Sequence, residues 1–268
     1  MNSLNHDAPA TACKNPTPSL AGDLLDAARK LKALAYGQPP DPQAAAVAQD
    51  ELQHIAACLQ SLDPFAQLRD RPVALAFWIN TYNALVIHGA VAAGIKTSVN
   101  EVQGFFRRTA YRIGRSVFSL DAIEHGILRG NRGHPARLVL PQWMPWDHRR
   151  KLVIRPMDLR IHFALNCGAA SCPPIRHYTA QNIDAELDLA AASFLAGGGV
   201  RLDPTTGKVH LSRLFLWFWR DFGLSKQKQL DRACRCSTNT FDPKTRETLL
   251  AAARSAGIVY DPYDWTFA

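Results

Sequence analysis

Hydrophobic residues in the first quarter of the chain recur at the spacing of an α-helix. One apolar stripe predicts a helix over residues 20–36, and a second predicts a helix over about 42–62. A proline-rich segment that begins at Gly37 separates the two. The folded part of the chain is therefore expected to begin with two amphipathic helices. The stripes consist of Leu24, Leu25, Ala28, Leu31 and Leu34 in the first helix, and of Leu52, Ile55, Ala56 and Leu59 in the second.

The longest apolar stretch, residues 73–94, predicts a third helix that is enclosed on most sides, because it is apolar nearly all round. Asp70 can cap its first turn, and Pro72 suits the first helical positions. Asn80 and Asn83 lie one turn apart on this helix. Buried carboxamides left without partners cost about 1–3 kcal/mol each. The pair therefore predicts either a structural polar network or groups that orient an imidazole or hold an oxyanion.

A different pattern begins after Asp158, where apolar residues alternate with Arg160, His162 and Asn166. This period of two predicts a strand over 159–166 with one apolar and one mostly polar face. The chain then breaks at a glycine and two prolines, which places Cys172 in a constrained loop directly after the strand.

The rest of the chain mixes short strands with helices. We expect a short strand that leads into a helix within 116–129, with Ser119 or Asp121 near the start of the helix, then a helix over 179–195, a hairpin from 200–202 to 208–211, and a helix over 245–256. The order predicts an α+β fold in which N-terminal helices and a buried central helix pack on a small, mostly antiparallel sheet. Residues 1–19 are expected to be a disordered lead-in. A single domain follows over 20–268, with a helical part at 20–65 and a core at 66–268.

Composition supports a folded protein of ordinary type. Of the 268 residues, 47% are hydrophobic and 20% are charged, and no apolar run is long enough to span a bilayer. The chain starts without a basic region followed by an apolar region, so no secretory signal is visible and a cytoplasmic location is the default expectation. The six cysteines are sparse and scattered, which favours reduced thiols over disulfides.

The net charge of +8 is concentrated in one segment. Residues 105–160 hold twelve Lys or Arg and four Asp or Glu, and that difference of eight equals the excess of the whole chain. Such a segment can attract an anionic small molecule or peptide, or can simply form a solvated surface, which is the commoner outcome. No nucleic-acid-binding motif accompanies the charge, so we do not expect DNA or RNA as a partner.

The residues around the break after 166 offer parts of a thiol-dependent site. A thiolate needs a nearby base or cation, and His162 can supply it to Cys172, the better-placed nucleophile. Cys167 continues the strand, where a small buried side chain is its simplest role. Arg160 and Asn166 share the face of His162, so we group them with Cys167 as candidates for substrate binding.

Glu124 and His125 add two more titratable groups. They are adjacent in a predicted helix and point about 100° apart, so at most one is expected to face the site. Glu124 can orient His162 or pair with Arg129 on the helix surface. His125 completes the candidate substrate-binding set.

Several of these blocks occur together in one known family. The order of Phe77-Trp78-Ile79-Asn80 and Tyr82-Asn83-Ala84-Leu85, then Glu124-His125, then His162 to Cys167 with Ser171-Cys172-Pro173, and finally Tyr263-Asp264-Trp265 resembles the domain of unknown function 547 family over roughly residues 50–268. More loosely, a buried helix followed by a histidine-bearing strand is similar to the papain and transglutaminase-like superfamily. That resemblance implies a nucleophilic cysteine at the start of the central helix. Here that position holds none, so the nucleophile would be lost or moved to Cys172.

Two functions follow as hypotheses. The first is a thiol-dependent hydrolase or acyl-transferase in which Cys172 attacks a carbonyl and His162 takes its proton, while Asn80, Asn83 or Glu124 orients the imidazole or holds the oxyanion. The second is a non-catalytic binding or scaffold module. A metal site formed by His162, Cys167 and Cys172 is a weaker third option, and we expect no cofactor or metal.

Overall fold

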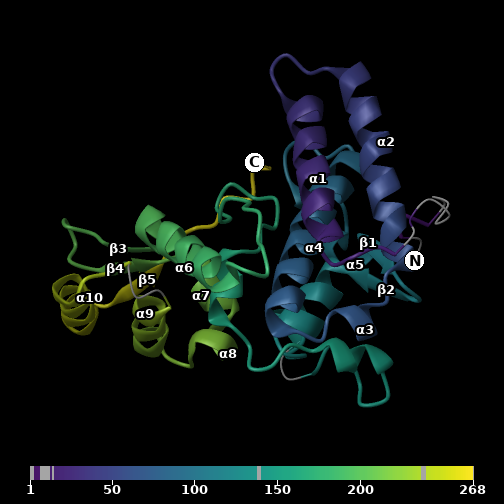
Figure 1. Ribbon diagram of the computed structural model, residues 1–268. Helices are drawn as coiled ribbons and strands as arrows, with labels where there is room; N and C mark the ends of the chain where they lie inside the picture. Colours follow the sequence, from purple (N-terminus) through teal and green to yellow (C-terminus); the bar gives the residue numbers. More distant parts are fainter. Residues whose placement is uncertain (1–2, 7–12, 14, 138–139, 237–239, 268) are drawn as a thin grey trace.

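The elements of the chain gather into two lobes, each around its own hydrophobic core (Figure 1). The structure is a computed structural model, and it describes residues 3–6, 13, 15–137, 140–236 and 240–267. The lobes follow one another in sequence, except that the end of the chain returns from the second lobe to the first. Phe163, which lies in the segment that connects the lobes, packs in the core of the second lobe.

The first lobe begins with the two predicted helices, which pack side by side and against the central helix. Asp41 begins the second of them, because its carboxylate accepts a hydrogen bond of 2.9 Å from the Ala44 N–H. Both helices and the central one are confirmed. They are α1 (Leu20–Tyr36), α2 (Pro42–Cys58) and α4 (Arg71–Ala92).

The central helix α4 is buried on nearly every side, as its apolar sequence predicts. It packs on an antiparallel pair of strands, β1 (Ala110–Ile113) and β2 (Ser116–Ser119). Trp78 contacts Phe118 with ring centres 5.0 Å apart, and His88 Nδ1 lies 2.7 Å from the Tyr111 hydroxyl. These contacts confirm a buried helix on a small antiparallel unit.

Short helices complete the first lobe and lead into the second. One of them, η4, is a π-helix that follows β2 and carries Glu124 and His125. The short helices are η2 (Leu59–Ser61), α3 (Pro64–Gln67), η3 (Val99–Glu101), α5 (Phe105–Arg108), η4 (Ala122–Leu128), η5 (Pro135–Arg137), η6 (His148–Leu152) and η7 (Leu159–Phe163).

The second lobe combines helices with a three-stranded sheet. The predicted hairpin is confirmed: β3 and β4 pair antiparallel, with Val200 opposite Leu211. The strand β5 then adds parallel to β4, so this sheet is mixed and the fold is α+β. The elements are α6 (Ile183–Phe194), η8 (Leu195–Gly199), β3 (Val200–Leu202), β4 (Val209–Leu211), α7 (Arg213–Trp217), α8 (Trp219–Phe222), α9 (Lys226–Arg235), α10 (Pro243–Ser255) and β5 (Ile258–Tyr260).

The prediction of a strand over 159–166 is wrong. Leu159–Phe163 forms the 3₁₀-helix η7, and the Asp158 carboxylate caps it by accepting a hydrogen bond of 3.0 Å from the Arg160 N–H. The alternation does not mark two faces, because residues 161–166 are all buried. Ile161 packs in the first core and Phe163 in the second, so the segment is buried from both sides. The histidine-bearing strand that suggested a papain-like order is therefore not formed.

Part of the expected lead-in is ordered. Residues 3–6 lie against the first lobe, and Asn5 is fully buried. Its amide donates to the carbonyls of Ala56 (2.7 Å) and Arg112 (2.9 Å), and its oxygen accepts from the Arg112 N–H (2.8 Å). Asn5 thus joins the end of α2 to β1, which a disordered segment could not do.

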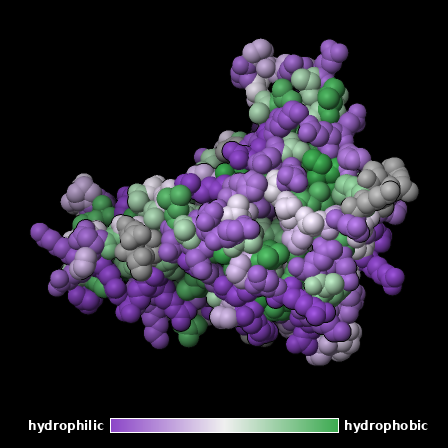
Figure 2. Space-filling view, viewed as in Figure 1, coloured by the Kyte–Doolittle hydropathy of each residue, from purple (hydrophilic) through white to green (hydrophobic). Residues whose placement is uncertain are grey.

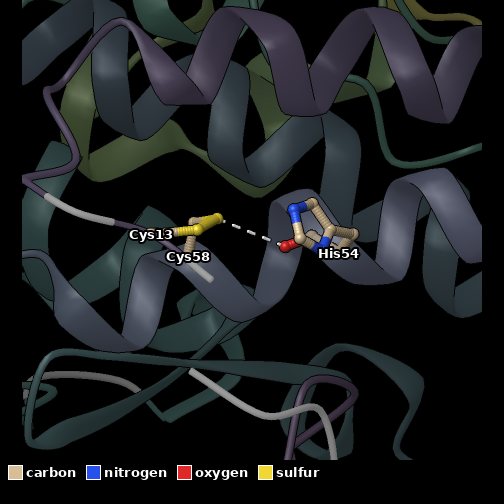
Figure 3. Close-up of side chains that lie close together, drawn as sticks. All are labelled: Cys13, His54 and Cys58. Atoms are coloured by element: carbon tan, nitrogen blue, oxygen red, sulfur yellow. Dashed lines mark hydrogen bonds between the residues drawn. A yellow bond between two sulfur atoms is a disulfide. The ribbon is translucent and has the colours of Figure 1, made fainter. Parts of the chain in front are cut away.

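The expectation of reduced thiols throughout is also wrong. Cys13 and Cys58 form a disulfide at the end of α2, with His54 one turn earlier on the same helix (Figure 3). The two cysteines are 45 residues apart in the sequence, and spacing alone does not show which cysteines pair. Disulfides are typical of oxidising compartments, so the cytoplasmic location stays a prediction.

The face shown in Figure 2 is mostly hydrophilic with scattered hydrophobic patches, and the ends of α1 and α2 project from the body. None of the helices within the described residues combines the length and the apolar character that crossing a membrane requires.

Replacing Asn5 with Ala should lower the free energy of unfolding by about 1–3 kcal/mol, because the Arg112 N–H would be left without its acceptor. Urea unfolding followed by circular dichroism measures this change. His6→Ala is the matched control, since His6 is exposed and its replacement should have almost no effect. Equal stability of the two variants would contradict the structural role of Asn5.

Candidate active site

A cavity of about 680 Å³ lies between the two lobes and collects most of the reactive groups of the chain. The first lobe contributes Glu124 and His125, and the second contributes Trp217 and Phe218. The loop that follows η7 and the C-terminal tail close the cavity with the cysteines and with two aromatic residues. The lining side chains from these two segments are Cys167, Cys172, Tyr263 and Trp265.

Asn166 shapes the loop that holds the two cysteines. Its side-chain amide donates to the Pro173 carbonyl (2.7 Å), and its side-chain oxygen accepts from the Gly168 N–H (2.7 Å). Gly168 has a φ of +85°, a conformation that favours glycine. Asn166 was predicted to bind substrate, but it is buried and its side chain forms hydrogen bonds within the loop. The loop is therefore a fixed support for the thiols.

The two thiols meet around one hydroxyl. The Tyr263 hydroxyl lies 3.0 Å from Cys172 Sγ and 3.2 Å from Cys167 Sγ. The backbone N–H of Cys167 also donates to Cys172 Sγ at 3.0 Å. Donors that converge on a sulfur favour its thiolate form. Cys172 is thus the thiol that the site is built to ionise.

The pKa is lowered for the thiol of Cys172 and raised for the thiol of Cys167. Burial raises the pKa of Cys172, but hydrogen bonds from Cys167, Tyr263 and the nearby backbone outweigh it and lower the value to about 7. The pKa of Cys167 is raised well above its usual range, first by its hydrogen bond with Cys172 and then by burial. At neutral pH, Cys172 therefore carries a substantial thiolate fraction while Cys167 keeps its proton.

Glu124 is the acidic group of the cavity with a pKa close to neutrality. It projects from the π-helix η4, a distortion that is frequent at functional sites. Burial raises its pKa to about 7, against the lowering effects of Arg129 and of the Tyr82 hydroxyl, which donates to Glu124 at 3.0 Å. The negative charge of Cys172 adds to the increase. The charges of the thiol and the carboxyl group therefore influence each other.

His162 lies in the same cavity but faces a different partner. Its Nε2 lies 3.0 Å from the Asp221 carboxylate, and within the described residues no hydrogen bond joins His162 to either thiol. Burial lowers the pKa of His162, so the neutral ring donates its N–H to Asp221. The sequence hypothesis that His162 takes the proton of Cys172 is not supported by this geometry.

Asp221 also holds two arginines. Arg129 Nε lies 2.6 Å and Arg132 Nη1 lies 2.7 Å from its carboxylate oxygens. The Arg129 guanidinium is buried and stacks over the Phe218 ring at 4.7 Å. Burial alone would raise the pKa of Asp221, but His162 and Arg129 hold it well below the usual range. This buried ionic cluster lies behind the cavity, because His162 and Phe218, which it contacts, both line the cavity.

His125 lines the cavity in front of this cluster. Arg129 donates to His125 Nδ1 at 3.0 Å, and burial followed by the charge of Arg129 lowers the pKa of His125 well below normal. Asp121, His125 and His134 each offer one potential metal-ligand atom, and these three atoms lie within 4.8 Å of one another. The adjacent arginine repels a metal cation and uses the Nδ1 lone pair, so the neutral ring keeps its proton on Nε2. These residues do not fit a metal site.

Asn80 and Asn83 form the structural network that was one of their two predicted roles. Asn80 exchanges hydrogen bonds with the backbone of Tyr178, donating at 2.8 Å and accepting at 3.0 Å. Asn83 donates to the Ala164 carbonyl (3.0 Å) and accepts from the Asn166 N–H (2.9 Å). Both amides are buried, and neither orients an imidazole. Asn83 contributes to the site indirectly, because it anchors the start of the cysteine loop.

Arg160 lies outside the cavity lining. Its guanidinium bonds to Asp158 (2.6 Å), Asp184 (2.8 Å) and Asp188 (2.8 Å), which fixes η7 to α6. The structure thus shows Arg160 in an ion-pair network, and its substrate-binding role stays a prediction. Arg129 and Arg132 are paired as well, so part of the positive excess of residues 105–160 is neutralised inside the protein.

Three important residues were not given a role from the sequence. Tyr82 lies between Asn80 and Asn83 on the central helix, but its hydroxyl points toward Glu124. Asp221 is an acidic residue within the aromatic-rich segment 214–222, and a lone acid in an apolar run is a signal that could have identified it. Tyr263 is distant in sequence from the thiols, so only the fold reveals its position.

The fold and the cavity define a two-lobed α+β protein with a thiol and a carboxyl group in one pocket. Residues 65–195 match the model of the family described as "Protein of unknown function, DUF547". The match supports the sequence resemblance to that family over these residues, while the looser papain-like similarity stays a prediction. The match includes the loop with Cys167 and Cys172 but ends before Asp221 and Tyr263. No curated protein and no solved structure matches the chain.

Replacing Asp221 with Ala should lower the free energy of unfolding by about 3–5 kcal/mol, because Arg129 would remain charged and buried without a partner. Asp231→Ala removes a partly exposed pair with Arg235 and Arg246 and should cost about 0–1 kcal/mol. Chemical denaturation at pH 7 compares the two variants.

The destabilisation by Asp221→Ala should shrink at acid pH. A carboxylate whose folded-state pKa is lowered stabilises the protein above its ordinary pKa of about 3.9, and this stabilisation is lost as pH falls through the lowered value. A pH-independent difference would argue against a stabilising charge on Asp221.

Proposed function

We propose that the cavity is the active site of a thiol-dependent hydrolase or acyl-transferase with Cys172 as its nucleophile. One observation carries the proposal: Cys172 Sγ lies in the cavity with the Cys167 N–H and the Tyr263 hydroxyl both 3.0 Å away. Two donors at that distance stabilise a thiolate, which is the reactive form of cysteine. A thiolate in a largely apolar pocket of this size is suited to attack a bound carbonyl group.

In the first step, the thiolate attacks the carbonyl carbon of an ester, thioester or amide. A sulfur–carbon bond forms, the bond to the leaving group breaks, and an acyl group remains on Cys172. The leaving group needs a proton at this moment. Glu124 can supply it, because burial keeps a large part of its carboxyl group protonated near pH 7.

In the second step, Glu124 acts in reverse. As a carboxylate, it accepts a proton from the incoming water or acceptor molecule, whose oxygen attacks the thioester carbon. The carbon–sulfur bond breaks, and the thiolate of Cys172 is restored. A charged Cys172 raises the pKa of Glu124, so a site that holds the thiolate favours the protonated acid. That pairing is the one the first step requires.

The other groups have supporting roles in this proposal. Tyr82 holds Glu124 by its 3.0 Å hydrogen bond, and Tyr263 holds the sulfur. His162 lines the cavity, is held by Asp221 and does not act on Cys172. The aromatic residues of the second lobe and the tail, among them Trp217 and Trp265 with ring centres 5.5 Å apart, offer a surface for an apolar acyl group.

Alkylation by iodoacetamide tests the nucleophile directly. The rate at Cys172 should reach half its maximum near pH 7, against about 8.5 for an ordinary cysteine. Peptide mapping should locate the fast-reacting label at Cys172, and Cys172→Ala should lose this fast reaction. Cys236→Ala should keep it, because the pKa of Cys236 is raised to about 12 and this thiol reacts slowly. A Cys172 that titrates like a free thiol would favour the binding or scaffold module instead.

Hydrolysis of ethyl acetate tests the acid, because its alkoxide leaving group must be protonated as it departs. Activity should rise with pH as the Cys172 thiol ionises and fall as Glu124 loses its proton, giving a bell centred near pH 7. Glu124→Gln should reduce the rate by about 10²–10⁴-fold and remove the basic limb. Glu247→Gln changes an exposed glutamate and should leave the profile unchanged. A Glu124→Gln variant that retains the full rate and both limbs would contradict the assignment.

A further inference from the structure

Cys167 has no role in the acyl-transfer steps, yet the fold keeps it beside Cys172. Both sulfurs lie against the same Tyr263 hydroxyl, at 3.2 and 3.0 Å, so their separation cannot exceed the sum of these distances. The two thiols also share a hydrogen bond that affects both pKa values. A nucleophilic thiol with a second thiol in contact is the arrangement that thiol–disulfide exchange uses.

The loop between the cysteines is compatible with bringing them together. The Cys172 N–H donates to the Ala169 carbonyl at 2.9 Å, which folds the loop into a turn. Asn166 fastens the loop at both ends, through Gly168 and Pro173. Both sulfurs line the open cavity, so a small oxidant can reach them from solvent.

We propose that Cys167 and Cys172 are a reversible disulfide site, with Cys172 as the attacking thiol and Cys167 as the resolving thiol. The disulfide itself does not depend on the proposed function. Only its consequence does: oxidation would remove the nucleophile of the acyl-transfer reaction and switch the enzyme off.

The chemistry needs a low-molecular-weight disulfide as oxidant. The Cys172 thiolate attacks one sulfur of that disulfide, a mixed disulfide forms on Cys172, and one thiolate leaves and takes a proton. Cys167 then loses its proton and attacks Cys172 Sγ, which releases the second small thiol. In total, the two cysteines are oxidised to one disulfide while the oxidant is reduced to two thiols.

The second step becomes easier once the first is complete. The main cause that holds the pKa of Cys167 high is its interaction with Cys172. In the mixed disulfide, the negative charge on Cys172 is gone. The pKa of Cys167 should then fall toward its ordinary value, and its thiolate becomes available at the moment when it is needed.

The remaining thiols do not show the same arrangement. Cys13 and Cys58 are already joined. Cys234 and Cys236 have pKa values raised by burial, to about 11 and about 12, so neither offers a thiolate near neutral pH. Among the described cysteines, the loop pair is therefore the one prepared for exchange.

Incubation with glutathione disulfide at pH 7.5, followed by alkylation and tryptic mapping, tests the proposal. Both cysteines fall in one tryptic peptide, residues 161–176, because no Lys or Arg lies between Arg160 and Arg176. That peptide should lose both free thiols, carry no glutathione and regain both thiols with dithiothreitol. In Cys167→Ser, a glutathione adduct on Cys172 should accumulate, whereas Cys236→Ser should behave like the wild type.

A stable glutathione adduct on Cys172 of the wild type would overturn the proposal, because Cys167 would then fail to resolve it. Two thiols that stay free under the same conditions would overturn it as well. The result is independent of ethyl acetate hydrolysis. A disulfide in a protein without that activity would leave this inference standing and remove only the acyl-transfer function, and the converse would do the opposite.

Discussion

The buried carboxylate of Asp221 is the interaction on which the arrangement of the two lobes depends. It comes from the second lobe, and it binds Arg129 of the first lobe together with His162 of the connecting turn. Neither the buried guanidinium nor the carboxylate would be tolerated alone in this environment. Because His162 and His125 contact this cluster and line the cavity, the charges that join the lobes also hold part of the polar lining of the candidate site.

The thiol side of the cavity depends on the return of the C-terminal tail. The Ala170 N–H donates to the Thr266 carbonyl (2.8 Å), and the Phe267 N–H donates to the Thr97 carbonyl (2.7 Å). These backbone contacts fix the tail to the first lobe and carry Tyr263 to the cysteines. The site therefore combines groups from both lobes with one hydroxyl from the tail. A fragment limited to residues 65–195 would hold both thiols but lack Tyr263 and Asp221.

The sequence analysis succeeded where one element could be judged by itself and failed where a pattern had two structural explanations. The central helix is apolar on all sides, and no other element of that length fits such a run. The alternation over 159–166 was taken as a strand with one polar face. The segment is instead buried between the two lobes, so its polar residues do not mark an exposed face, and Leu159–Phe163 forms a 3₁₀-helix. His162 was predicted as a site residue and does line the cavity, but its pairing with Asp221, 59 residues away, could not be predicted from sequence spacing.

The sequence by itself determined the α+β class, the helices of the first lobe, the hairpin of the second, and the loop with its two thiols. Each of these follows from local periodicity or from chain breakers, which act over a few residues. Tertiary structure decided which charges meet and which thiol is ionised. A pKa depends on burial and on groups that lie close in space, so Cys172 and Glu124 acquire their values near neutrality only when Tyr263, Tyr82 and Arg129 are in place.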